Sequence, residues 1–490
     1  MGYILSFDQS TQGTKAMILD AEGRIICRRD LPHRQIVNSD GWVSHDPEEI
    51  YSNVLGVAKK VIEDSGIDAA EIAAIGISNQ RETSVAWNRE TGKPACHAIV
   101  WQCARAKELC ERVVESGVSE EILDKTGMPV SSYFPASKMA WILENEPLAA
   151  EWAREGMLCF GTIDSWLVFN MTGGAEHRTD YSNASRTQLF NIHTLSWDED
   201  ICRAFGIDIR CLPKVTDSDG FYGETDLGGI LPKKVQICGV LGDSHGALFG
   251  QGCIERGMTK ATYGTGSSIM MNIGETAVKS KNGLVTSLAW KWNGKVNYVM
   301  EGNINYTGAA ISWLQKDVKL IESAGETEAL CREANADDTT YLVPAFSGLG
   351  APYWNSNAKA AFIGMSRTTG RAELVKATVE CIAYQIADVV RAMEADSEIK
   401  VPVLRVDGGP TKNGYLMQFQ SDILGSSVQV PDAEELSGLG AGYMAGIHCG
   451  LYNESVLSRL NSVRYNAQMF ADRKDSLIAG WLDAVKSVIR

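Results

Sequence analysis

The sequence lacks the residue patterns that mark disulfide-rich, metal-dependent and P-loop proteins. None of the twelve cysteines belongs to a Cys-x-x-Cys pair, and no two of the seven histidines have His-x-x-x-His spacing. Because zinc sites and redox motifs need such spacings, neither is expected, and the cysteines are predicted to be reduced and mostly buried. No segment matches Gly-x-x-x-x-Gly-Lys-Ser/Thr, which excludes the Walker A phosphate loop.

Basic residues and long apolar runs are also scarce. The chain has 46 Lys and Arg against 61 Asp and Glu, a net charge of −15. This balance disfavours nucleic acid or an anionic membrane surface as a partner, although backbone N–H groups can still hold phosphates. No uncharged apolar run reaches about 18 residues, and residues 1–8 do not resemble a signal peptide. We therefore expect a cytoplasmic protein without a nucleic-acid or membrane partner.

What the sequence does contain is an alternation of strand and helix patterns. Its 490 residues are enough for two to four domains. Short apolar segments separated by turns predict strands, and apolar residues at helical spacing predict helices. The strands are expected at residues 3–8, 15–19, 24–28, 72–77 and 235–241, and the helices at 47–63, 371–395 and 475–489. This order is typical of an α/β protein with a partly parallel sheet.

The pattern of the opening segment returns near the middle of the chain. Residues 260–273 again form a short strand, a turn rich in Gly, Thr and Ser, and a second apolar strand. The residues themselves differ too much to prove a repeat. We interpret the similarity as two related α/β halves, joined between Gly246 and Glu255.

Four glycine-rich segments could hold a phosphate-bearing ligand. Two are hairpin tips in opposite halves, and one follows an apolar strand and precedes a helix, where N–H groups are free to bind an anion. The fourth, at residues 438–442, fits either such a site or close packing of a helix. The segments are residues 8–15, 263–267, 406–413 and 438–442.

Charged residues follow two other predicted strands. Asp243 comes directly after the strand at 235–241, where open α/β sheets bind their ligands. A carboxylate there can take the proton from a hydroxyl that attacks a γ-phosphorus. The adjacent Arg81 and Glu82 offer a donor and an acceptor for vicinal hydroxyls, or else a surface ion pair. His245 is interpreted as structural rather than as the base.

Taken together, these segments resemble the FGGY family of carbohydrate kinases, and within it the glycerol kinases. The resemblance extends from the first hairpin to about Tyr452. The segments that carry it are residues 41–49, 78–83, 98–102, 179–187, 263–266, 343–354 and 362–380.

The resemblance implies an actin-like ATPase fold of two RNase-H-like domains with a cleft between them. It places an N-terminal domain at 1–247 and a C-terminal domain at 248–490. The implied activity is ATP- and Mg²⁺-dependent phosphorylation of a small polyol or sugar, with Asp243 as the general base. The implied acceptor-binding residues are Arg81, Glu82, Trp101, Tyr133, Asp243, Ser244 and Ser268. The implied ATP-binding residues are Thr11, Thr14, Lys15, Thr265, Gly308, Ser312, Gly409 and Asn413, and Asp8 is implied near the metal.

Several positions depart from the pattern of the glycerol kinases. Ser268 stands in place of a Phe and Ser244 in place of a Gln, so the acceptor pocket is expected to be larger and richer in hydroxyls. Lys15 replaces the usual Arg, Ser312 a usual Gln, and Cys103-Ala104 an Asp-Arg pair. The acceptor is therefore glycerol or a longer polyol or ketose, such as erythritol or a pentulose.

A function of another class is a nucleotide-gated binding module on the same scaffold. Asp243 and the Arg81–Glu82 pair argue against it, because a pure binder needs neither.

The protein is also expected to form a homo-oligomer.

Overall fold

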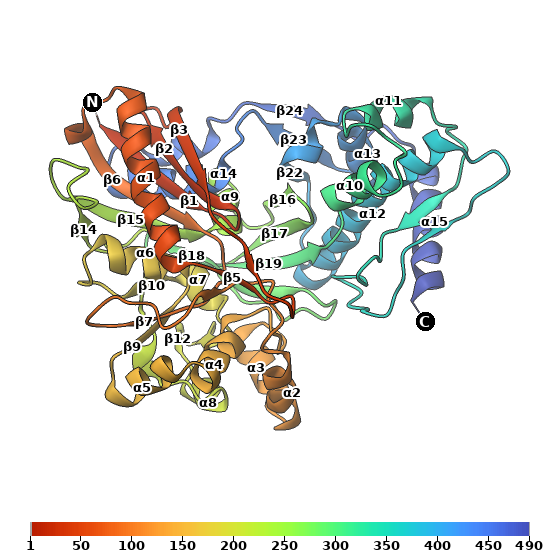
Figure 1. Cartoon of the computed structure of the whole chain (residues 1–490). Helices are drawn as coiled ribbons and strands as arrows, with labels where there is room; N and C mark the ends of the chain where they lie inside the picture. Colours follow the sequence, from red (N-terminus) through yellow and green to blue (C-terminus); the bar gives the residue numbers. More distant parts are fainter. Residues whose placement is uncertain (1, 490) are drawn as a thin grey trace.

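The structure, a computed structural model, describes residues 2–489 and contains two mixed sheets (Figure 1). The first sheet has six strands in the order β14-β15-β6-β1-β2-β3. Its strands are β1 (Tyr3–Gln9), β2 (Gly13–Leu19), β3 (Ile25–Pro32), β6 (Ile72–Asn79), β14 (Glu224–Thr225) and β15 (Val235–Gly242). β1 pairs antiparallel with β2 and parallel with β6, which is parallel to β15.

The second sheet has seven strands in the order β18-β19-β17-β16-β22-β23-β24. They are β16 (Thr259–Tyr263), β17 (Ser267–Gly274), β18 (Val285–Trp292), β19 (Lys295–Ile304), β22 (Val403–Asp407), β23 (Ser427–Pro431) and β24 (Ser462–Tyr465). β16 pairs antiparallel with β17 and parallel with β22, which is parallel to β23. The pairing of β1, β2, β6 and β15 therefore recurs in β16, β17, β22 and β23, as expected for two related halves.

Helix α1 (Pro47–Ser65) shows how local sequence sets an element of this fold. The Asp46 carboxylate accepts hydrogen bonds from the N–H groups of Glu48 and Glu49, Pro47 fills the first helical position, and Gly66 ends the helix at φ 70°. The apolar face of α1 packs on β2 and β3. The other face of the sheet is covered by α14 (Leu436–His448).

Helices α9 (Asp243–Gly250) and α14 (Leu436–His448) lie between the two sheets in a shared apolar core. A Cβ atom on Gly440 of α14 would lie 1.9 Å from the Gly246 carbonyl oxygen of α9, and one on Gly76 of β6 would lie 2.5 Å from that of Ala441. The glycines at 438–442 therefore allow α14 to pack closely against its neighbours. Of the two interpretations of this segment, a phosphate-binding site or close helix packing, the structure supports close packing. Because α14 packs on β1, β6 and β15, the chain returns to the first sheet near its C-terminus.

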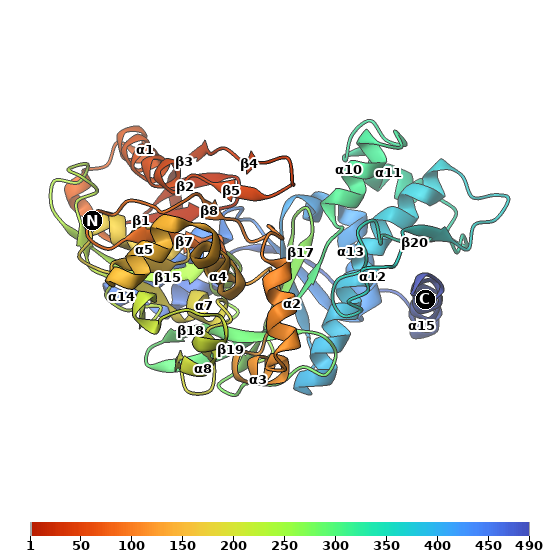
Figure 2. The ribbon, with the colours of Figure 1, turned by 60° about the horizontal axis from the view of Figure 1, so that its bottom comes forward.

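The remaining large elements form two regions. An insertion below the first sheet in Figure 1 contains β7 (Val85–Asn88), β9 (Leu158–Gly161), α2 (Lys107–Glu115), α3 (Ser119–Thr126), α4 (Pro135–Asn145), α5 (Pro147–Glu155) and α8 (Glu199–Ala204). Above it, α6 (Ile163–Met171) packs beside α1 on the first sheet, and α7 (Tyr181–Ser185) packs on β18. The helices beside the second sheet are α10 (Gly308–Lys316), α11 (Glu326–Glu333), α12 (Arg371–Ser397), α13 (Gly414–Leu424) and α15 (Ala471–Val488). Figure 2 shows α12 running alongside α13, with α10 and α11 next to them.

Short strands complete the chain. They are β4 (Ile36–Val37), β5 (Val43–His45), β8 (Ala98–Ile99), β10 (Arg178–Asp180), β11 (Phe190–Asn191), β12 (Ser196–Trp197), β13 (Lys214–Thr216), β20 (Tyr341–Val343) and β21 (Ala361–Ile363). Within residues 2–489, no helix has the length and apolar character needed to cross a bilayer.

Candidate active site

The site is built where parallel strands end. The carboxyl ends of β1, β6 and β15 lie at one edge of the first sheet, with Gln9 paired to Asn79 and Asn79 to Gly242. This register brings together residues that are far apart in sequence: Asp8 from β1, Arg81 after β6, and Asp243 at the start of α9. In the second sheet the turn at 264–266 and Gly408 follow β16 and β22 in the same way.

Arg81 is the centre of a buried hydrogen-bond network. Its Nε donates to Asp243 Oδ1 at 3.1 Å, while Nη1 and Nη2 donate to the two carboxylate oxygens of Glu301 at 2.9 and 2.8 Å. Nη2 also donates to Ser244 Oγ at 3.2 Å. Four of the five N–H groups of the guanidinium therefore donate to other side chains of the protein. Arg81 thus orients Asp243 and has only one N–H group left for a ligand.

Glu301, on β19, is the site residue that the sequence reasoning missed. Its side chain is 1% exposed, and the charges of Arg81 and Arg186 hold its pKa well below the ordinary value in spite of burial. Arg186 Nη1 lies 3.0 Å from Glu301, and Arg186 Nε donates to Glu82 Oε1 at 2.5 Å. In the sequence, Glu301 is the single acidic residue of an apolar strand segment, and this feature could have indicated its role.

Glu82 does not pair with its neighbour Arg81 as the sequence allowed. It lies in the left-handed region at φ 60°, which is strained for a residue other than glycine, and it is 2% exposed. The two adjacent side chains reach different partners, since Arg81 contacts Asp243 and Glu301 and Glu82 contacts Arg186.

Asp243 itself remains accessible. Its side chain is 35% exposed, although Arg81 and the N–H of Ser244, at 2.6 Å, both donate to Oδ1. His245, two residues further, is fully buried, and burial lowers its pKa well below the ordinary value. Neither of its ring nitrogens forms a hydrogen bond with a described residue, so a neutral, structural histidine fits best.

Two aromatic residues line the same region. Trp101, after β8, donates from Nε1 to Thr11 Oγ1 at 2.9 Å, and its ring meets that of Tyr133 edge-on at a centroid distance of 5.6 Å. Burial raises the pKa of Tyr133, whose carbonyl accepts a 2.5 Å hydrogen bond from the buried Lys138. These contacts fix an aromatic wall next to the first hairpin.

The two serines that replace larger residues are held by the charged network. Ser268 Oγ donates to Glu301 Oε1 at 2.9 Å, and Ser244 Oγ accepts from Arg81. Both side chains are only partly buried. Each serine therefore presents a small, ordered polar surface beside Asp243.

Asp8 combines burial with an excess of negative charge. Its side chain accepts from Ser78 at 3.0 Å, and burial raises its pKa to about 6, with Glu435 and Asp243 adding to the effect. Lys15 Nζ is 3.9 Å from Asp8 and 2.7 Å from Glu435, so its charge is shared. The neighbouring Thr14 hydroxyl is buried and forms no hydrogen bond with a described residue.

Four of the predicted ATP-binding residues line one cavity of about 460 Å³ beside the second sheet. They are Gly308, Ser312, Gly409 and Asn413. The N–H of Gly308, at the start of α10, donates to the Gly264 carbonyl at 2.9 Å, which fixes the hairpin tip that carries the exposed Thr265. Apolar side chains of α10, α12 and α13 complete the cavity, which suits an aromatic base at one end and phosphates at the helix N-termini.

Comparison with known proteins agrees with this arrangement. Models of the N-terminal and C-terminal domains of the FGGY family of carbohydrate kinases match residues 3–250 and 259–449. The chain belongs to the FGGY family of carbohydrate kinases. The chain is 46% identical to glycerol kinase 2 of Thermotoga maritima over 491 residues, covering 99% of this chain and 98% of that protein. It is equally similar to a glycerol kinase of Burkholderia pseudomallei, at 46% identity over 99% of this chain and 97% of that protein.

Solved structures of the family confirm the fold. A glycerol kinase of Plasmodium falciparum with ADP superimposes with a TM-score of 0.94 at 36% identity, covering 100% of this chain and 99% of that one. A xylulose kinase of Lactobacillus acidophilus has a TM-score of 0.89 at 19% identity, which shows the fold alone, over 99% of this chain and 98% of that one. The predicted actin-like α/β fold of two domains is thus confirmed. The protein is an ATP-dependent carbohydrate kinase of the glycerol kinase type, which transfers a phosphoryl group to an alcohol.

Proposed function

We propose that Asp243 is the general base of this kinase and that Arg81 holds its carboxylate toward the acceptor. The proposal is supported by the 3.1 Å contact between Arg81 and Asp243 at the carboxyl edge of the sheet, with Asp243 Oδ2 left without a donor among residues 2–489. That oxygen takes the proton from the acceptor hydroxyl as the hydroxyl attacks the γ-phosphorus. Glu82, Trp101 and Tyr133 form the acceptor-binding surface around it.

ATP is proposed to span the two sheets. The cavity formed by Gly308, Ser312, Gly409 and Asn413 holds the nucleoside end, and Thr265 contacts the phosphates. Thr11, Thr14 and Lys15 of the first hairpin are proposed to hold the phosphates from the opposite side, Thr14 through its backbone because its side chain is buried.

The residues at Asp8 fit the Mg²⁺ that the family implies. Within residues 2–489 there is no cluster of three or more metal-binding side chains, whereas Mg²⁺ with ATP needs one or two carboxylates and the phosphates. Asp8 is such a carboxylate, and burial, together with the nearby acids Glu435 and Asp243, raises its pKa. A bound cation would favour the ionised form of this carboxylate. The bound ion would neutralise charge on the β- and γ-phosphates.

Two acceptor classes are proposed. Glycerol follows from the names of the relatives. A linear polyol or open-chain ketose of four or five carbons is favoured by Ser244 and Ser268, which occupy little volume and place hydroxyl groups beside the base. We favour the longer acceptor for that reason.

The experiment is a panel of acceptors with labelled ATP. It contains glycerol, erythritol, ribitol, xylulose and ribulose, and kcat/KM is measured for each. Higher kcat/KM for a four- or five-carbon compound than for glycerol supports the longer acceptor, and the reverse order assigns glycerol. Absence of label transfer to every compound would refute the proposed acceptor classes.

Three further parts of the proposal concern organisation. The boundary between the two domains is proposed to lie between residues 247 and 248, although α14 packs on the sheet of the first domain. The chain is also proposed to form a homo-oligomer and to be located in the cytoplasm. Light scattering coupled to gel filtration measures the oligomeric state.

A further inference from the structure

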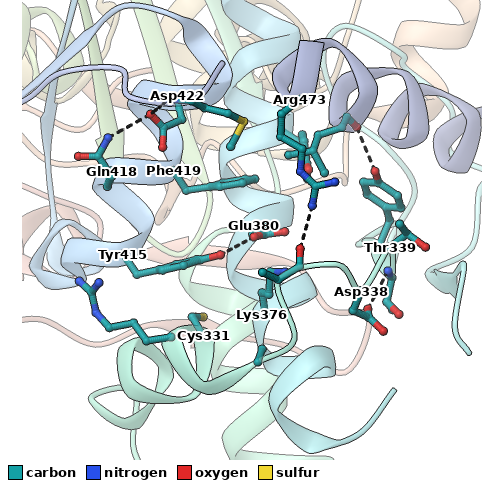
Figure 3. A pocket seen from close by; sticks show the side chains of 18 residues that line it. Cys331, Asp338, Thr339, Lys376, Glu380, Tyr415, Gln418, Phe419, Asp422 and Arg473 are labelled. Carbon is teal, nitrogen blue, oxygen red and sulfur yellow. Dashed lines mark hydrogen bonds between the residues drawn. The ribbon is translucent and has the colours of Figure 1, made fainter. Parts of the chain in front are cut away.

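A second cavity, of about 540 Å³, lies beside the second sheet, apart from the ATP-binding cavity (Figure 3). It is bounded by α11, α12, α13, the N-terminal part of α15 and the loop at 334–340. Its volume is in the range of roughly 300–1,000 Å³ that small-molecule sites occupy. Neither the reaction nor the predicted site residues account for it.

The floor of this cavity combines a buried acid with aromatic rings. Glu380 is 7% exposed, and its Oε1 accepts a 2.5 Å hydrogen bond from the Tyr415 hydroxyl. Tyr415 is stacked on Phe419, and the Phe419 ring meets Tyr384 edge-on. No basic nitrogen among the described residues lies within 4 Å of Glu380, so its second oxygen can accept from a hydroxyl group that enters the cavity.

The mouth carries two cations without an acidic partner. Lys376 Nζ and Arg473 Nη2 donate to the carbonyls of Asn335 and Ala336, at 3.1 and 2.8 Å, and neither forms an ion pair with a described residue. Their charges oppose the effect of burial, which raises the pKa of Glu380. Of the other acids here, Asp338 accepts from Thr340 and Thr369, and Asp422 accepts from the backbone at 468–469. Two cations that line one cavity without an ion-pair partner among the described residues are suited to bind a phosphate group.

The same helices form the ATP-binding cavity on their other side. Arg332, at the second cavity, donates to Glu328 at 2.7 Å, and Glu328, at the ATP cavity, accepts from the N–H of Gly414 at 3.1 Å. Asn413, which caps α13 and lines the ATP cavity, donates to Thr327 of α11. A ligand that moves α11 or α13 therefore reaches the ATP site through direct contacts.

We propose that this cavity binds a phosphorylated polyol, with its hydroxyls on Glu380 and its phosphate on Lys376 and Arg473, and that binding changes the affinity for ATP. The carbon chain of such a molecule lies against Phe419 and Tyr415. Since a phosphorylated polyol is the class of molecule that the proposed reaction makes, the cavity is a feedback site. This identification of the ligand with the product rests on the proposed function, whereas the presence of the binding site does not.

The test is equilibrium dialysis of the full chain with labelled sn-glycerol 3-phosphate and erythritol 4-phosphate. We compare the parent protein with the double variant Lys376→Met/Arg473→Met, and with Lys486→Met as the control on the same helix α15. The parent is expected to bind two molecules per chain, one of them at the active site. The double variant is expected to lose about tenfold or more in affinity at one of them, because each charge-assisted hydrogen bond lost weakens binding severalfold. The control is expected to behave like the parent.

The coupling to ATP is measured at saturating acceptor, which keeps the phosphorylated compound out of the active site. The KM for ATP of the parent is expected to change at least twofold in its presence, and that of the double variant to stay constant. Glu380→Gln tests the hydroxyl contact and should weaken binding of the polyol phosphate while leaving that of inorganic phosphate unchanged.

Three results would overturn the proposal: one bound molecule per chain in the parent, equal binding by parent and double variant, or binding of inorganic phosphate as tight as that of the polyol phosphate. A KM for ATP that does not respond would overturn the coupling. Failure of the proposed function shows separately, as absent label transfer in the acceptor panel, because dialysis needs no turnover.

Discussion

Replacement of Glu301 by glutamine tests whether the buried charge network holds the catalytic geometry. In the parent, Glu301 accepts hydrogen bonds from Arg81 and Ser268 and forms an ion pair with Arg186. Glu301→Gln keeps the shape but leaves two buried guanidinium groups with less negative charge. Breaking a buried pair in this way costs about 3–5 kcal/mol. For a domain of roughly 240 residues, with an unfolding entropy near 0.5 kcal/mol/K, Tm should fall by about 6–10 °C.

The effect on stability should depend on pH. The pKa of Glu301 is lowered on folding from an ordinary value of 4.5, so the ionised carboxylate stabilises the fold above that pH and loses this contribution as the pH falls. The difference in Tm between parent and Glu301→Gln should therefore stay constant from pH 7 down to about pH 4.5 and shrink only as the pH falls below 4.5. Differential scanning calorimetry across this range measures it, with the exposed Glu275→Gln as the control.

The same substitution should also slow catalysis. Arg81 donates to both Glu301 and Asp243, and a displacement of the base by about 1 Å can cost on the order of 10²-fold in rate. We expect kcat to fall by about that factor while the KM for ATP changes little. A variant with Tm within 2 °C and kcat within about threefold of the parent would show that the network does not position the base.

Three further predictions concern single residues of the site. Asp243→Asn should keep ATP binding and lose about 10²–10⁴-fold in kcat, since it removes the proton acceptor; turnover within about threefold of the parent would contradict its assignment as the base. Ser268→Phe should lower the ratio of kcat/KM for a longer acceptor over that for glycerol, because the ring fills the pocket at a cost of about 1–3 kcal/mol, and an unchanged ratio would place Ser268 outside it. With the pKa of Asp8 raised to about 6, the KM for Mg²⁺ should fall as the pH rises from 5 to 7, and Asp8→Asn should remove this dependence; a parallel pH profile in the variant would refute it.

The sequence was most informative where local signals set the structure. The strand predicted at 72–77 is observed at Ile72–Asn79 and the helix predicted at 47–63 at Pro47–Ser65, because each carries a regular apolar pattern and α1 has a cap at each end. Helix α15, predicted from residue 475, begins at Ala471. Its start has no side-chain cap, so no residue type marks the first turn.

The partners of site residues were not readable from the sequence in the same way. Asp243 was predictable because it directly follows a buried strand, and its position needs only local structure. Arg81 and Glu82 were adjacent and of opposite charge, yet their partners lie 162 to 220 residues away for Arg81 and 104 residues away for Glu82. Spacing along one chain gives no information on which distant strand will lie opposite a side chain.

The Arg81–Glu301 pair also limits how far the two sheets can separate. Arg81 follows β6 of the first sheet and Glu301 belongs to β19 of the second, so the pair joins the two sheets at the proposed acceptor site. Separating the sheets there would break the Arg81–Glu301 pair, and breaking a buried pair costs about 3–5 kcal/mol. The proposed ATP-binding cavity, in contrast, is lined by α10, α11, α12 and α13, which carry no part of this network. We therefore expect that a movement of these helices admits ATP at a lower free-energy cost than separation of the sheets. The proposed acceptor site and Asp243 would then stay in place.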